Sequence, residues 1–152
     1  MTTEEVLVAE STTTYGAAVA HSLLQSGYRV RALVEDLSHP AAERLRRRGA
    51  QLAWCPVLDG AALREAVQGV AIVCAGAYER VQTPHYTEHS LQLVDAAVRA
   101  RVRHFIYSSY PAAHVRTGVP RFDSRHEVER FLQASGLRST VLCPAWFMEQ
   151  LL

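Results

Sequence analysis

The loop from Glu10 to Gly16 combines the side chains and spacing best suited to binding a charged ligand. It reads ESTTTYG and lies between the apolar run VLVA and an Ala/Leu-rich helical segment. The first N–H groups of a helix have no intrahelical acceptor, so a strand, a short loop and a helix start can hold an anion. Thr12 and Thr14 add donors, whereas Glu10 adds a negative charge. The pattern predicts a nucleotide-type loop whose own charge opposes a phosphate.

Hydroxyl groups gather at a second place, Tyr107-Ser108-Ser109-Tyr110, at the end of the fifth apolar run. A tyrosine can transfer a proton when a nearby lysine lowers its pKa, but the chain contains no lysine. This excludes a Tyr-x-x-x-Lys pair, a Schiff-base lysine and a P-loop lysine. Two interpretations stay open for these hydroxyls: hydrogen bonds to the nearby backbone, or contact with a ribose or substrate.

His85 and His89 are spaced i,i+4 and could face one metal ion, but no third ligand is evident, and we predict no metal. The cysteines are Cys55, Cys74 and Cys143. They lie far apart in apolar segments without a C-x-x-C, which favours buried thiols over disulfides or a zinc site.

These residues are positioned by apolar segments of strand length that alternate with segments of helical period. Near-continuous runs of Val, Ile, Leu and Ala are typical of strands covered on both faces. The pattern predicts one α/β domain, residues 1–152, with a doubly wound parallel sheet of about six strands in three α/β/α layers. The expected strands are Val6–Ala9, Arg29–Val34, Gln51–Trp54, Val70–Ala75, His104–Ser108 and Ser139–Cys143. The expected helices are Gly16–Ser26, Pro40–Arg48, Gly60–Gln68, His85–Arg101 and Asp123–Ser135, and 110–121 is the longest expected loop.

The composition narrows the class of partner. The 152 residues carry a net charge of +1, and no apolar run approaches the roughly 20 residues that span a bilayer. We therefore expect neither a nucleic-acid nor a membrane partner, and a cytoplasmic or nuclear location. Arginines cluster in 44–48 and 99–103, where two helices are expected to end. They either complement the helix dipoles or bind an acidic protein partner.

Five segments together resemble the NmrA-like family, a branch of the atypical short-chain dehydrogenase/reductases. These are VRALVED, AAERLRRRGAQL, LQLVDAAVRARVRHFIYSS, RFDSRHEVERFLQASGL and STVLCPAWFMEQLL, which cover almost the whole chain from Val30 to Leu152. The resemblance implies a Rossmann fold that binds NAD(P). It also implies either a reductase or a regulator that senses the dinucleotide and acts through a protein partner.

The loop departs from the family pattern T-G-A-T-G-x-x-G. Its first two glycines correspond to Glu10 and Thr13, while Thr12 and Gly16 match. The first glycine makes the tight turn and the second lets the backbone approach the pyrophosphate. Thr13 therefore brings a branched side chain into that approach, and Glu10 brings like charge.

Three further positions of the implied site also differ. NADP-using relatives tend to have an arginine where this chain has Glu35 followed by Asp36, which favours NAD over NADP. The family's Gly-Asp after the third strand is Cys55-Pro56, and the lysine of its FDSK segment is Arg125, which cannot donate a proton near neutral pH. We expect a weak NAD(P) site without catalytic residues. Its cofactor contacts would be Thr12, Gly16, Glu35, Ser108 and Arg125.

The last residues carry a further expectation. In relatives the segment like Phe147-Met148-Glu149 leads into a substrate-binding region, which we expect to be absent here, leaving an apolar end for a partner or for self-association. Three hypotheses follow: a non-catalytic, redox-sensing regulator; an active NAD(P)-dependent oxidoreductase; or a truncated, inactive paralogue.

Overall fold

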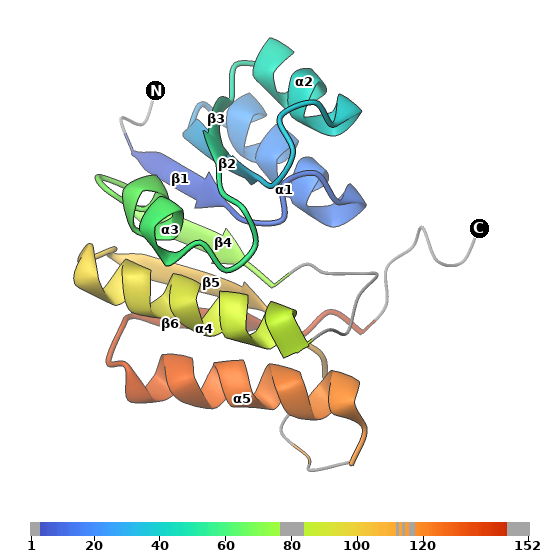
Figure 1. Ribbon diagram of the computed structural model, residues 1–152, viewed down its shortest axis with the longest axis vertical. Helices are drawn as coiled ribbons and strands as arrows, with labels where there is room; N and C mark the ends of the chain where they lie inside the picture. Colours follow the sequence, from blue (N-terminus) through green and yellow to red (C-terminus); the bar gives the residue numbers. More distant parts are fainter. Residues whose placement is uncertain (1–3, 77–83, 112, 114, 116–117, 146–152) are drawn as a thin grey trace.

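The computed structural model describes residues 4–76, 84–111, 113, 115 and 118–145, and it contains one parallel sheet. The strands lie in the order β3-β2-β1-β4-β5-β6, and each is parallel to its neighbours (Figure 1). Their bounds are β1 Glu5–Val8, β2 Arg29–Val34, β3 Gln51–Trp54, β4 Ile72–Ala75, β5 His104–Ser108 and β6 Ser139–Leu142. The doubly wound α/β fold expected from the sequence is confirmed.

Five helices connect the strands: α1 Thr14–Gln25, α2 Pro40–Arg47, α3 Gly60–Ala66, α4 Pro84–Arg99 and α5 Pro120–Ala134. Three of them start earlier than the apolar periodicity indicates, α4 by one residue and α1 and α5 by two or three. α1 starts at Thr14 because Thr13 caps it, and α5 starts at Pro120, whose fixed φ suits the first helical position. β4 starts later than expected, at Ile72, because the chain is still turning after Gly69.

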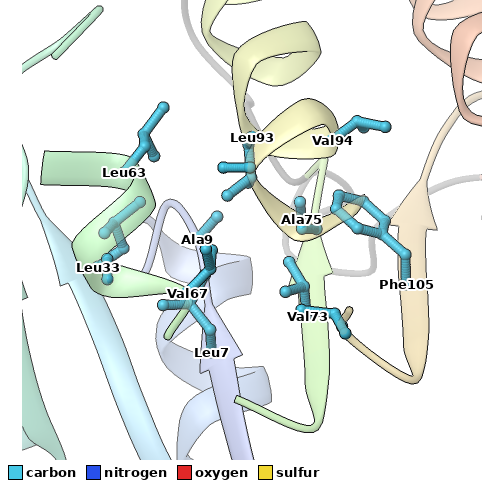
Figure 2. Packing of buried hydrophobic residues seen from close by; sticks show 14 of the residues in the cluster. Leu7, Ala9, Leu33, Leu63, Val67, Val73, Ala75, Leu93, Val94 and Phe105 are labelled. Carbon is cyan, nitrogen blue, oxygen red and sulfur yellow. The ribbon is translucent and has the colours of Figure 1, made fainter. Parts of the chain in front are cut away.

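The helices cover the sheet in two groups, and each group has its own core. Leu63, Leu93, Val128 and Leu132 bring α3, α4 and α5 against one face. Leu7, Val73 and Phe105 of the strands are buried on the same face (Figure 2). On the other face Ala20 of α1 and Leu45 of α2 pack against β1 and β2. These three layers hold the carboxyl ends of all the strands at one edge. Among the described helices, none has the length and apolar character needed to cross a membrane.

Candidate functional site

The strand order reverses between β1 and β4, and open parallel sheets bind ligands in the crevice at such a switch point. The loop from Ala9 to Thr13 leaves β1 beside this crevice and leads into α1. Its second residue, Glu10, has a φ of 47°, in the left-handed region that favours glycine. The conformation costs a non-glycine residue roughly 1–2 kcal/mol. The tight turn of a glycine loop is therefore kept although the glycine is not.

Gly16 supplies the close contact between α1 and this loop. A Cβ at Gly16 would overlap the backbone carbonyl of Glu10, so only glycine fits. The retained glycine of the sequence pattern is thus explained by packing of the helix onto the turn.

Thr13 caps α1 and occupies one of the donors that an anion would use. Its Oγ1 donates to the carbonyl oxygen of Glu10 at 2.8 Å and accepts from the N–H of Gly16 at 3.0 Å. An N-cap side chain of this kind satisfies a first-turn N–H that would otherwise be open to a ligand. Thr12, which we expected to contact a cofactor, lies half-buried in the same turn.

The side chain of Glu10 reaches across the switch point. Its Oε2 accepts a hydrogen bond of 3.1 Å from the N–H of Gly76, the residue that follows β4. Gly76 has a φ of 102°, and a Cβ there would overlap the backbone of Ser108 on β5. A carboxylate therefore joins the ends of β1 and β4, in the crevice where a Rossmann-type domain places a pyrophosphate.

Arg125 of α5 lies behind this carboxylate with only 5% of its surface exposed. Its Nη1 donates to the carbonyl oxygens of Gly76 at 2.6 Å and Ser108 at 3.3 Å. The same nitrogen lies 2.7 Å from the hydroxyl of Tyr86 and 3.2 Å from that of Tyr107. One guanidinium thus connects α5 to β4, α4 and β5.

Three tyrosine rings surround that guanidinium. Its central carbon lies 4.7 Å from the ring centroid of Tyr86, 5.3 Å from that of Tyr110 and 5.8 Å from that of Tyr107. A cation at these distances is attracted to the negative faces of the rings. We call Arg125, Tyr86, Tyr107 and Tyr110 the arginine cage.

The surroundings of the arginine cage raise the pKa values of Arg125, Tyr86 and Tyr107. Burial would lower the pKa of Arg125, but Tyr86, Tyr107 and Glu10 outweigh it and raise that pKa. Burial raises the pKa of Tyr86 well above its ordinary value of 10.0, and the charge of Glu10 adds to the effect. Burial also raises the pKa of Tyr107. Arg125, Tyr86 and Tyr107 therefore keep their protons near neutral pH.

The loop after β2 carries the two carboxylates predicted to select against a 2′-phosphate. Glu35 and Asp36 are both exposed there. Asp36 accepts from the Oγ of Ser38 at 2.6 Å and from its N–H at 2.8 Å, and these bonds lower the pKa of Asp36. The carbonyl of Glu35 accepts from the indole N–H of Trp54 at 3.1 Å. This end of the crevice is anionic.

The two histidines that are spaced i,i+4 on α4 lie in different environments. His85 is exposed, whereas His89 is buried and accepts from the N–H of Leu58 at a long 3.5 Å. Burial lowers the pKa of His89, which keeps the ring neutral. The described residues contain no group of three or more His, Cys, Asp or Glu side chains arranged to hold a metal.

Ser108 lines a hollow at the ends of β1, β4 and β5, which Ala9, Gly16 and Ala75 also border. The hollow has a volume of about 200 Å³ and is almost entirely apolar, with Tyr15, Val19, Cys74, Ile106 and Leu142 among its walls. Leu142 of β6, one of these walls, is 44% exposed. Ser108 thus borders this apolar hollow, while its carbonyl oxygen accepts a hydrogen bond from Arg125.

The structure therefore brings Glu10, Gly76 and Arg125 together, whereas Glu35 is exposed directly after β2. Sequence reasoning singled out Glu10 and Arg125 separately, but it missed Gly76 and Tyr86. The signal for Gly76 was a glycine directly after the strand that borders the switch point. For Tyr86 it was an aromatic residue in the first turn of the helix that follows.

A parallel sheet with a capped helix at its switch point defines the class of the protein, a Rossmann-type domain. The model of the NmrA-like family matches residues 2–152, and the chain belongs to that family.

Relatives and solved structures share this fold over about half of their own length. An NmrA-like family domain-containing oxidoreductase of Aspergillus hancockii is 28% identical, over 99% of this chain and 49% of its own. The photosystem II assembly factor Ycf39 of Cyanophora paradoxa is also 28% identical, over 97% of this chain and 47% of its own. Two solved structures superpose closely. The NADPH-dependent quinone oxidoreductase of Escherichia coli, in complex with NADPH, gives a TM-score of 0.83 at 25% identity and covers 95% of this chain and 50% of its own. The negative transcriptional regulator NmrA, in complex with NADP, gives 0.81 at 25% identity and covers 93% and 45%.

Proposed function

We propose that this chain is a non-catalytic NmrA-like domain that binds dinucleotide weakly and acts as a redox-sensing regulator through a protein partner. The observation that carries the proposal is the hydrogen bond from the N–H of Gly76 to the carboxylate of Glu10. A pyrophosphate in the crevice would meet this carboxylate and would have to displace it. At roughly 5 Å and an effective dielectric near 20, repulsion between two unit charges is about 3 kcal/mol.

The chemistry of Arg125 supports the non-catalytic part. Reduction of a carbonyl or quinone needs a group that can deliver a proton, and a guanidinium does not lose one in proteins. Tyr86 and Tyr107 beside it have raised pKa values, so they do not replace a lysine. NAD is favoured over NADP, because Glu35 and Asp36 would repel a 2′-phosphate but can accept bonds from a ribose hydroxyl.

The second candidate is an NAD(P)-dependent oxidoreductase of the atypical short-chain type. It is favoured by the relatives named as oxidoreductases and by the quinone reductase that binds NADPH on the same fold. In that case Ser108, Tyr110 or Arg125 would position the substrate rather than transfer a proton.

Oxidation of NADH and NADPH in the presence of a series of quinones separates the two candidates. We expect no turnover above the rate without protein, at any pH between 6 and 8. The quinone reductase of Escherichia coli serves as the positive control for each quinone. Saturable, protein-dependent oxidation of either cofactor would overturn the proposal and support the oxidoreductase.

A further inference from the structure

The exposed face of α2 carries more positive charge than its helix position explains. Its sequence is PAAERLRR, followed by the C-cap residue Arg48. The last turn of α2 contains Arg44, Arg46 and Arg47, whereas α3 and α4 each have one basic residue in their last turn and α1 and α5 have none. Complementing a helix dipole therefore does not require such a cluster in this fold.

Charge already present in α2 offsets only part of the cluster. Glu43 is its one acidic residue, and its carboxylate accepts from Arg46 at 2.8 and 2.9 Å and from Arg47 at 2.8 Å. The helix C-terminus contributes about half a negative charge. Together they offset fewer than two of the four arginines.

Arg44 and Arg48 are the two arginines of this cluster that are not paired with Glu43. Both are exposed, and neither forms an ion pair with a carboxylate in the described ranges. They are spaced i,i+4, so their like charges lie on one side of the helix and repel each other. Ala41, Ala42 and Leu45 of the same helix are buried against the core, whereas the side chains of Arg44 and Arg48, which flank this buried face, are exposed to solvent.

We propose that Arg44 and Arg48 of α2 bind an acidic segment of a protein partner, in which carboxylates occupy alternate positions of an extended chain. The two arginines are about 6 Å apart along the helix axis, and alternate residues of an extended peptide are about 6.8 Å apart. An acid-x-acid pair therefore places one carboxylate on each guanidinium. The inference rests on the partner-binding part of the proposed function and identifies the surface for it.

A nucleic acid fits this face less well. The helix is eight residues long, about 12 Å, and Glu43 lies within it. A long polyanion would extend beyond the arginines, and the whole chain has a net charge of only +1. The crevice lies at the carboxyl edge of the sheet, whereas α2 ends at the opposite edge beside β3 (Figure 1). The acidic segment and a dinucleotide would not compete.

Fluorescence anisotropy with a labelled eight-residue peptide that has glutamate at alternate positions tests the proposal. We expect saturable binding that weakens with added salt, and a loss of at least fivefold in the double variant Arg44→Gln, Arg48→Gln. The matched control is Arg101→Gln with Arg138→Gln, which removes two exposed arginines from the same edge of the sheet and should leave the affinity unchanged. The glutamine version of the peptide should not bind.

Three results would overturn this surface: no binding of the acidic peptide, an equal loss in both double variants, or tighter binding of an eight-nucleotide single strand or of anionic vesicles. None of these results would change the proposal that the chain is non-catalytic, because quinone-dependent oxidation of NADH and NADPH is measured separately. Turnover in that assay would overturn the regulator even if the peptide bound.

Discussion

Replacing both Glu10 and Thr13 by glycine is expected to raise the affinity for NAD at least tenfold. Glycine at position 10 removes the carboxylate and suits the φ of 47°. Glycine at position 13 removes the hydroxyl that occupies the N–H of Gly16. A tenfold gain corresponds to about 1.4 kcal/mol, less than half of the roughly 3 kcal/mol estimated for charge repulsion alone. Isothermal titration with NAD measures the change.

The single variant Glu10→Gln is the matched control, because it removes the charge and keeps the bulk. If the negative charge of Glu10 is the main obstacle to NAD binding, this variant should show most of the gain in affinity. Replacing the Thr13 cap by glycine should lower the free energy of unfolding by roughly a few tenths of a kcal/mol, and thermal melting must confirm that the double variant is folded at the titration temperature. Unchanged affinity in the double variant would show that Glu10 and Thr13 are not the main obstacles. Cys55 and Pro56 would then have to account for the weak site.

Replacing Arg125 by alanine is expected to cost about 3 kcal/mol of unfolding free energy. The change leaves two backbone carbonyls and two tyrosine hydroxyls without their cationic donor, and it leaves Glu10 without the nearby positive charge. For a chain of this length the melting temperature should fall by roughly 6–12 °C.

Arg130→Ala provides the control, since Arg130 lies on the same helix but is exposed, and surface substitutions change stability little. Arg125→Lys restores the residue type of the family and should be intermediate, because an ammonium keeps the charge without the planar guanidinium. Equal melting temperatures for the Arg125→Ala and Arg130→Ala variants would show that the arginine cage does not stabilise the fold.

Local patterns in the sequence were enough to predict the elements of the fold. Near-continuous apolar runs such as Val6–Ala9 gave the strands, and glycines such as Gly27 and Gly136, both at positive φ, gave the ends of helices. The beginnings of α1 and α5 were less accurate, because Thr13 and Pro120 act through capping and a fixed φ rather than through apolar periodicity.

The site was predictable only in part, because its contacts join residues far apart in the chain. The charge of Glu10 could be read from the loop, but its partner, the N–H of Gly76, is 66 positions away and lies beside it only through the strand order. Arg125 was expected to contact the cofactor. The motif gave its position but not its rotamer, and the structure shows its Nη1 donating within the protein. Whether Thr12, Gly16, Glu35, Ser108 and Arg125 contact a cofactor remains a prediction.

The affinity of the unaltered protein for NAD, NADH, NADP and NADPH tests the central claim most directly, namely that the Glu10 carboxylate occupies the dinucleotide crevice. We predict dissociation constants weaker than about 100 μM, or about −5.5 kcal/mol, for all four, with NAD and NADH bound more tightly than their phosphorylated forms. A low-micromolar dissociation constant for NADPH would contradict two claims: that the Glu10 carboxylate occupies the crevice, and that Glu35 and Asp36 select against a 2′-phosphate.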